Sequence, residues 1–341
     1  MQPTTIGLDI AKHVFQMHGV DAAGRVVARK KLRRSQVAAF FGALPPCLIG
    51  MEACGTAHYW ARELAALGHE VRLMPATYVK AYAKRGKSDA IDAEAICEAV
   101  TRPTMRFVPI KSAEQQAILM LHRTRDLLVR QRTMLVNALR GHLAEFGLVG
   151  PKGIWRLPEL RALAASAPAS QLPDLAREGV ELILAQLDEL QRRIGTVERS
   201  IQLWHRRSDV SRRLETIPGI GVITATALAA TITDVGAFAS GRQLAAWIGL
   251  VPRLNGTGGK VHLGRISKQG DRYLRRLLVL GATSLVRYAR ARPDRAPWIA
   301  ALLARRPARV VTVAVANKLA RVAWAVLSRG EEFRSSQPAA A

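Results

Sequence analysis

The sequence predicts an α/β domain followed by an all-α region. Three observations support this fold class. Strand-like apolar runs alternate with helical patterns over residues 1–110, a heptad repeat follows over residues 111–209, and helical periodicity fills residues 210–330. The chain has 341 residues and 49% hydrophobic content, which is enough for two or three domains with buried cores. Residues 331–341 are expected to be a tail.

The first segment is expected to form a mixed sheet with helices on its faces. Turn residues Asp21 to Gly24 join two strands, Ser35 is placed to begin a helix, and Gly68 to end one. The expected elements are strands at 4–10, 14–20 and 25–32, a helix at 35–44, a strand at 47–53, a helix at 57–67, a strand at 69–75, and a helix that starts near Asp89.

The middle segment has the pattern of a coiled coil. Leu121, Leu128 and Leu135 recur every seven residues in a long helical stretch, and residues 148–176 are expected to be an irregular insert. A second seam alternates spacings of four and three over Ile183, Leu187, Leu190, Ile194, Val197, Ile201 and Trp204. Two such helices can form an antiparallel hairpin within one chain or part of an oligomer interface, and the pattern does not decide between them.

The C-terminal segment is expected to be helical around 242–248, 271–290 and 308–328, with Gly330 closing the last helix. IPGIG (217–221) before a run of small residues is typical of a helix-hairpin-helix turn that offers backbone N–H groups to a phosphate. A plain helix start with Pro and Gly is the alternative. The apolar run 310–327 contains Lys318 and Arg321, which favours a packed helix over a membrane span.

The charge distribution indicates a polyanionic partner. The chain carries 51 Lys and Arg against 26 Asp and Glu, and residues 201–341 hold 23 of the basic and 7 of the acidic residues. Such an excess is typical of proteins that neutralise DNA or RNA phosphates. Three cysteines without paired spacing argue against disulfides and zinc, and neither a signal peptide nor an ATP-binding loop is recognisable. A cytoplasmic, nucleoid-associated protein without a membrane partner is expected.

Four carboxylates stand out against their apolar surroundings. Asp9 lies in TIGLDIAK and Glu52 in LIGMEACGT, each at the end of an expected strand, while Asp89 and Asp92 lie three apart at a helix start. Buried strands rarely hold lone carboxylates, and four together would repel one another unless divalent cations lay between them. Oxygen ligands suit Mg²⁺ or Mn²⁺. Separate structural roles are the alternative, such as a cap by Asp89 or an ion pair of Glu52.

A second candidate site is the stretch NGTGGKVHLGRISKQGD (255–271), which has five glycines and no aromatic residue. It is expected to be a loop that approaches a phosphate closely. The surrounding basic residues are expected to contact phosphates without reading bases, or in part to form a solvated helix face. With Ser267 they make up the expected nucleic-acid-binding set: Arg253, Lys260, Arg265, Ser267, Lys268, Arg272, Arg275 and Arg276.

The motif blocks GLDIAK, MEACGT and KSDAIDA, followed by GLVPR and GRISKQGD, resemble those of the DEDD transposases of bacterial insertion sequences, which are related to Piv-type invertases. The resemblance implies an RNase H-like (RuvC-like) N-terminal domain, a coiled-coil connector and a helical C-terminal transposase domain. It also implies that Asp9, Glu52, Asp89 and Asp92 are catalytic and hold the metal. RNA-guided members use a structured bridge RNA, and their composite site, built from different protomers, implies a dimer or tetramer.

The sequence departs from the family at the nucleophile. Family members carry a serine in the glycine-rich stretch, whereas this chain reads Asn255-Gly256-Thr257. Thr257, Ser267 or a metal-held water are the three candidates for the attacking oxygen. The function predicted is an RNA-guided transposase or recombinase that cuts and rejoins DNA. Two alternatives remain, a hydrolytic RuvC-like nuclease that uses the acidic residues alone and a catalytically degenerate nucleic-acid-binding relative.

Overall fold

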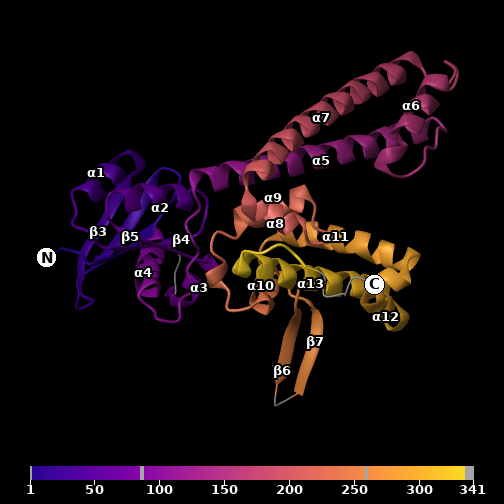
Figure 1. Cartoon of the computed structure of the whole chain (residues 1–341). Helices are drawn as coiled ribbons and strands as arrows, with labels where there is room; N and C mark the ends of the chain where they lie inside the picture. The colour runs from indigo at the N-terminus through magenta and orange to yellow at the C-terminus, as the bar shows by residue number, and fades with distance from the viewer. Residues whose placement is uncertain (1, 85–87, 258–259, 335–341) are drawn as a thin grey trace. The chain divides into compact units, whose positions relative to one another are not determined.

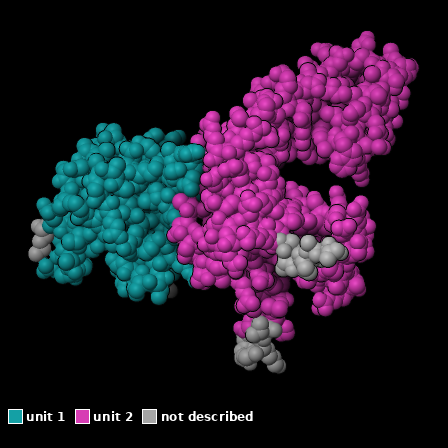
Figure 2. All heavy atoms as spheres, viewed as in Figure 1, with its two compact units in different colours: residues 1–116 teal, residues 117–341 magenta. Residues whose placement is uncertain are grey.

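The structure is a computed structural model that describes residues 2–84, 88–257 and 260–334, without the side chains of residues 257, 260 and 261. It divides into two compact units, residues 1–116 and 117–341, which Figure 2 shows in teal and magenta. The first unit holds a five-stranded sheet, and the second is mostly helical (Figure 1). The fold class predicted from the sequence is therefore confirmed.

The sheet of the first unit is mixed, with strand order β3-β2-β1-β4-β5. The β1–β2 and β2–β3 pairs are antiparallel, and the β1–β4 and β4–β5 pairs are parallel. All five strands fall where the strand-like apolar runs and the turn residues placed them. Their bounds are β1 (Thr5–Asp9), β2 (Val14–Val20), β3 (Val26–Arg33), β4 (Leu48–Glu52) and β5 (Glu70–Met74).

Helices cover both faces of this sheet. Ile6 and Leu8 of β1 pack with α1 and α2 in one buried cluster, and α4 lies against β1, β2 and β4. The expected cap by Ser35 is wrong, because the Gln36 side chain accepts the Arg33 N–H instead. The helices of this unit are α1 (Val37–Gly42), α2 (Ala57–Ala66), α3 (Ala76–Val79) and α4 (Asp89–Val100).

The two long helices α5 (Ala113–Glu145) and α7 (Asp174–Arg207) form an antiparallel hairpin. Arg125 bonds Glu198 at 2.7 Å and Arg132 bonds Gln191 at 2.6 Å, so the partner number falls as the α5 number rises. All seven seam residues of α7 are buried or half-buried. The seam of α7 therefore packs within one chain, as the antiparallel-hairpin alternative predicts. The insert expected to be irregular contains α6 (Leu157–Ser166), whose Leu160 is buried between the long helices.

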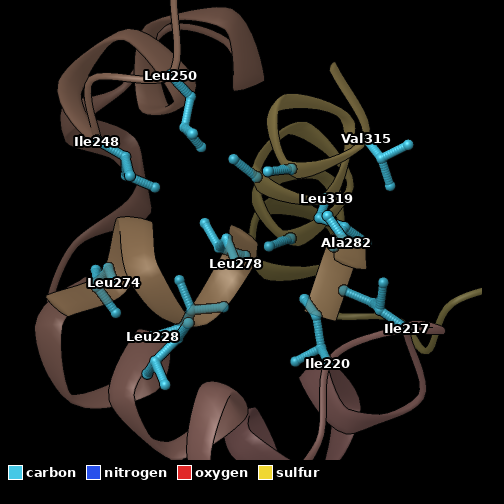
Figure 3. Close-up of a cluster of buried hydrophobic side chains, with 14 of the residues drawn as sticks. Ile217, Ile220, Leu228, Ile248, Leu250, Leu274, Leu278, Ala282, Val315 and Leu319 are labelled. Carbon is cyan, nitrogen blue, oxygen red and sulfur yellow. The ribbon is translucent and has the colours of Figure 1, made fainter. Parts of the chain in front are cut away.

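The C-terminal bundle has one large apolar core, part of which Figure 3 shows. Leu274, Leu278 and Ala282 of α11 share this core with Val315 and Leu319 of α13. Among the described helices, α13 is long and apolar enough by length and composition to cross a membrane, yet one of its faces is buried here. The helices are α8 (Asp209–Glu215), α9 (Val222–Thr231), α10 (Gly241–Trp247), α11 (Arg272–Ala291), α12 (Pro297–Arg305) and α13 (Ala308–Arg329).

One turn and one β-ribbon of the C-terminal unit bear on the predicted phosphate contacts. The turn 217–221 joins α8 to α9, and Gly219 there has φ +87° and packs against Gly281 of α11. The stretch expected to be a glycine-rich loop instead forms a two-stranded antiparallel ribbon, β6 (Pro252–Thr257) and β7 (Lys260–Ile266). Cross-strand hydrogen bonds hold this segment in an extended conformation. Few of its residues are β-branched, so their strand propensity alone would not predict it.

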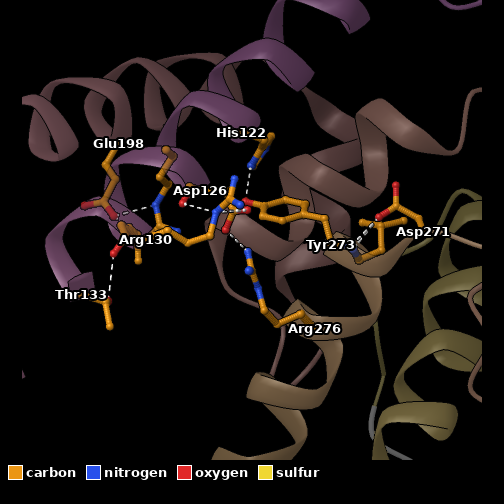
Figure 4. A network of polar contacts seen from close by, with 11 residues as sticks. His122, Asp126, Arg130, Thr133, Glu198, Asp271, Tyr273 and Arg276 are labelled. Carbon is orange, nitrogen blue, oxygen red and sulfur yellow. Dashed lines mark hydrogen bonds and ion pairs between the residues drawn. The ribbon is translucent and has the colours of Figure 1, made fainter. Parts of the chain in front are cut away.

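A polar network ties the hairpin to the bundle (Figure 4). His122 of α5 is buried, and its ring nitrogens lie 3.0 Å from the Tyr273 hydroxyl and 3.0 Å from the Thr226 hydroxyl. Arg276 of α11 forms an ion pair with Asp126 of α5. Burial, with a smaller effect of the Arg125 charge, lowers the pKa of His122 to about 4. The imidazole is therefore neutral at physiological pH, which leaves one ring nitrogen free to accept a hydrogen bond.

We expect His122 to make the bundle sensitive to acid. Its folded pKa lies below its ordinary value of 6.5, so its stabilising effect is full above pH 6.5 and is lost as the pH falls towards 4. The free energy of unfolding should fall by up to about 3 kcal/mol over that range. His122→Gln should flatten this loss in urea unfolding measured from pH 7 to pH 4. His142→Gln, at an exposed position of the same helix, should leave the profile unchanged, and an unchanged profile for His122→Gln would contradict the assignment.

Candidate functional site

Asp9 and Glu52 end two neighbouring parallel strands. The parallel register pairs Leu8 with Met51, so the next residues along, Asp9 and Glu52, lie side by side at the same edge of the sheet. Parallel strands are about 4.8 Å apart, which brings the two backbones within reach of one shared ligand. Both carboxylates are half-buried. The strand ends therefore supply two of the four predicted carboxylates from adjacent positions.

Helix α4 brings the other two carboxylates to this edge. Gly7 and Gly50 are register partners on the sheet face that α4 covers. A Cβ atom on Gly7 would lie 2.1 Å from the Ala93 carbonyl oxygen, and one on Gly50 would lie 2.7 Å from Val100 Cβ. Only the missing side chains allow the helix to approach so closely. Because alternate residues of a strand share a face, Asp9 and Glu52 point to the α4 side as well.

Asp89 and Asp92 lie in the first turn of α4, and Asp89 is not its cap. The Ser88 hydroxyl accepts the Ile91 N–H at 3.3 Å and serves as the N-cap. Ser88 thus takes the capping role that was the alternative considered for Asp89. Carboxylates in the first turn also interact favourably with the helix dipole. This position leaves Asp89 and Asp92 at the edge where β1 and β4 end.

The four carboxylates interact electrostatically. Burial, followed by the charges of Asp92, Asp89 and Glu52, raises the pKa of Asp9 to about 6. Burial and then the charge of Asp92 raise the pKa of Glu52. Both shifts mean that burial and repulsion by the neighbouring carboxylates disfavour the ionised forms of Asp9 and Glu52. A bound cation would favour those ionised forms.

The donor set fits a hard divalent cation. It consists of carboxylate oxygens, the ligands that Mg²⁺ and Mn²⁺ prefer, and three further carboxylates lie near enough to Asp9 to contribute to its raised pKa. Within the described ranges, however, no three His, Cys, Asp or Glu side chains are close enough to form a ready-made metal site. The carboxylates therefore share an edge and a charge environment without forming a closed cage of ligands.

Basic residues beside this edge were missed by the sequence analysis. Asp9 pairs in register with Gln16 of β2, and Gln16 pairs with Lys31 of β3. A groove of about 530 Å³ is lined by Gln16, Lys31 and Asp89, and also by Arg29 and Lys30. The sequence did contain a signal for these basic residues, because VVARKKLR has strand character and carries four of them. The acidic edge therefore borders a groove that carries three basic side chains.

The predicted basic set of the C-terminal unit divides into two groups. Arg265, Lys268 and Arg272 are exposed, and so is Arg253, which donates to the Ser267 carbonyl at 3.1 Å. Lys268 has φ +54°, an uncommon conformation for a non-glycine residue, in the turn that leads into α11. These four side chains can meet a phosphate. Thr257 and Lys260 pair across the ribbon, but their side chains lie outside the description, as do Gly258 and Gly259.

The second group serves the fold of the protein. Arg275 donates to the Ile248 and Gln269 carbonyls, both at 2.7 Å, and so fixes the turn 267–270 against residues 247–249. Arg276 is paired with Asp126 and stacks on the Tyr273 ring. Ser267 is buried, with its hydroxyl near the Gln269 N–H. These three side chains therefore all have partners within the protein, and Ser267 also has little exposed surface.

Comparison with known proteins gives a consistent result. A model of the DEDD transposases of the IS110 type matches residues 6–147, and a model described as the transposase IS116/IS110/IS902 family matches residues 211–297. A probable family 20 transposase of Pseudomonas aeruginosa is 52% identical over 98% of this chain and 99% of its own length. The transposase for insertion sequence element IS1328 of Yersinia enterocolitica is 40% identical over 97% and 98%. That for IS1111A of Coxiella burnetii is 38% identical over 96% and 91%.

We expect Gly7→Ala to displace α4 from the sheet. The added methyl group would overlap the Ala93 carbonyl oxygen, which belongs to helix backbone and cannot rotate away. Overpacking of this kind costs about 1–3 kcal/mol. Thermal unfolding should show the loss, and hydrogen exchange should show reduced protection in α4. Gly42→Ala is the matched control, because its nearest neighbour would be a leucine methyl at 3.8 Å; equal stability of the two variants would contradict this packing argument.

Asp9→Asn should stabilise the metal-free protein at neutral pH. The raised pKa means that the folded state holds the proton more tightly than the unfolded state, so stability falls as the pH rises from about 4 to about 6. Because the carboxyl is half-buried, solvent screening limits the loss to about 1 kcal/mol. In EDTA, the variant should melt higher than the wild type at pH 7.5 and equally at pH 4. A variant that melts lower at pH 7.5 would show that the Asp9 charge is already compensated.

Proposed function

Since this chain belongs to the IS116/IS110/IS902 family of transposases and is therefore a DNA-cleaving and DNA-transferring enzyme, we propose that it cuts and rejoins DNA by a metal-dependent covalent mechanism. The observation that carries the proposal is the set of coupled carboxylates of Asp9, Glu52, Asp89 and Asp92 at one sheet edge. A DEDD domain implies the use of divalent metal. These residues would hold Mg²⁺ or Mn²⁺, which supplies charge neutralisation at the scissile phosphate.

The substrate contacts follow from the basic groups near each site. Lys31 and Arg29 border the acidic edge and would hold a DNA phosphate against it. Arg253, Arg265, Lys268 and Arg272 would position DNA beside the ribbon that carries Thr257. Lys260, the register partner of Thr257, adds a further cation at the end of the ribbon. The protein would thus hold the backbone of its substrate without reading bases.

Thr257 is the proposed nucleophile. Its hydroxyl oxygen would form a bond to phosphorus as the bond from phosphorus to the sugar oxygen breaks, and the sugar oxygen would take up the proton. The covalent link conserves the energy of the phosphodiester bond, so rejoining needs no ATP. The burial of Ser267 supports Thr257 over the other hydroxyl of this stretch. By the family resemblance, the complete site would combine the carboxylates of one protomer with Thr257 of another.

Oligomerisation and a guide RNA complete the proposal. Met120, Leu127 and Met134 recur every seven residues on the outer face of α5, where they are 61%, 48% and 66% exposed. An apolar heptad stripe of this kind supports a dimer or tetramer. The guide RNA rests on the family resemblance and on the basic charge, and base pairing would then supply sequence recognition. The enzyme would act in the cytoplasm, at the nucleoid.

An adduct trap tests the chemistry. The protein, purified with its RNA, is incubated with Mg²⁺ and DNA that spans the ends of its own element, and DNA-linked protein is detected on a denaturing gel. We expect an adduct with the wild type, loss of more than about a hundredfold with Thr257→Ala or Asp9→Ala, and retention with Thr257→Ser and Ser267→Ala.

The other outcomes point to the alternatives. Cleaved DNA without an adduct, unaffected by Thr257→Ala, would replace the covalent mechanism with hydrolysis. Loss of the adduct in Ser267→Ala with retention in Thr257→Ala would move the nucleophile to Ser267. If DNA is bound but no strand is broken with any divalent metal, the chain is a binding protein and the catalytic proposal fails.

A further inference from the structure

A large groove lies in the C-terminal unit between α13, α10 and the base of the ribbon. It measures about 1440 Å³ and is lined by residues of α10, α13, β7 and the start of α12. Small-molecule pockets usually enclose about 300–1,000 Å³, so a longer or larger ligand fits it better. Arg265 and Lys268 at its edge have been assigned above to the positioning of DNA. The other lining residues have no assigned function.

The floor of the groove is apolar. One face of α13 is buried in the core, and Val310, Val313 and Ala314 of another face line the groove. Apolar residues on both faces contribute to the hydropathy of α13. Two tryptophans border the floor. Trp298 is 43% exposed, and the Trp324 indole N–H donates to the Phe238 carbonyl at 3.0 Å, which fixes its ring.

The rim of the groove is positive. Six basic side chains line it, and among the described residues no acidic side chain does. One of the six, Lys318, lies 4.0 Å from the centre of the Trp298 ring and so places a cation beside an aromatic face. The six are Arg242, Arg265, Lys268, Arg309, Lys318 and Arg321. Charge complementarity therefore requires an anionic ligand, and the apolar floor requires one with apolar faces.

The groove is continuous with the ribbon that carries Thr257. Gly264, Arg265 and Ile266 of β7 form part of its wall. Lys260, opposite Thr257, is five residues from Arg265, a distance of about 17 Å along a strand. Between them the ribbon exposes a cross-strand leucine pair, Leu254 and Leu263, at 72% and 70%. Apolar surface therefore leads from the end of the ribbon towards the groove.

We propose that this groove binds an unpaired DNA strand that continues from the phosphate held at the ribbon. Duplex DNA would present phosphates to the rim but nothing apolar to the floor, because its bases are stacked inside. An unpaired strand offers both phosphates and base faces, and stacking on aromatic side chains is the usual way to hold such bases. Trp298 stacks a base, and Arg309, Lys318 and Arg321 contact phosphates. The choice of DNA rests on the proposed function, since that function places DNA at Thr257.

Fluorescence anisotropy of the full-length protein in EDTA tests this site without any cleavage. The probes are fluorescein-labelled oligo(dT), an oligo(rU) of the same length and a duplex of the same length. Trp298→Ala should weaken oligo(dT) binding about tenfold and leave duplex binding within twofold. Arg309→Ser with Lys318→Ser should reduce the slope of log K against log salt by about 1.4 for oligo(dT), since each phosphate contact to a single strand contributes about 0.7.

Matched controls are available on the helical hairpin. Trp155→Ala removes another exposed tryptophan, and Arg123→Ser with Arg199→Ser removes two other exposed cations. These variants should bind oligo(dT) like the wild type, and all variants should melt like it. Equal losses in the control variants, equal losses for the duplex, or a loss confined to oligo(rU) would overturn the proposal. So would a changed oligomeric state with unchanged oligo(dT) binding, which would make the groove an interface between copies.

Failure of the proposed chemistry gives a different result. If Thr257→Ala keeps DNA cleavage but Trp298→Ala still loses oligo(dT) selectively, the covalent mechanism fails and the groove assignment stands. If the adduct forms as proposed and Trp298→Ala binds oligo(dT) normally, the chemistry stands and the groove assignment fails.

Discussion

The acidic site depends on one steric constraint, the direct contact of helix α4 with the glycine pair Gly7 and Gly50. These residues pair in register, and neither tolerates a Cβ atom beneath the helix. The same strands carry Asp9 and Glu52 two residues further on, on the same face. The contact therefore sets how near the first turn of α4 comes to the strand ends. As a result, the carboxylates at the two strand ends and at the start of α4 interact electrostatically.

A comparable constraint organises the C-terminal unit. Gly249 and Gly270, both with positive φ, let the backbones of residues 247–249 and 267–270 touch, and Arg275 bonds carbonyls on both sides. The ribbon, the exposed Lys268 and the start of α11 are all anchored at this point. In this motif-rich stretch, Arg275 therefore holds the backbone in place, whereas the exposed Lys268 is free to contact a ligand.

The sequence predicted the sheet well, because strand-length apolar runs and turn residues are local signals. It missed the β6–β7 ribbon, since glycine and polar residues conceal strand character when pairing supplies the stability. It missed α6 because proline and alanine dominate the insert. It could not separate Arg275 from Arg265, since the direction of a side chain within a motif depends on tertiary contacts. Lys31 became a candidate only when register placed it across Gln16 from Asp9, and Arg29 only when it lined the same groove as Lys31 and Asp89.

The central claim is that the edge formed by β1, β4 and α4 holds a divalent cation. Anomalous diffraction from crystals grown with Mn²⁺ tests it most directly. The account predicts an anomalous peak bounded by the carboxylates of Asp9 and Glu52, with Asp89 or Asp92 as a further ligand, and no peak in crystals of Asp9→Asn. A well-ordered edge without a peak, or a peak that survives in Asp9→Asn, would contradict the account.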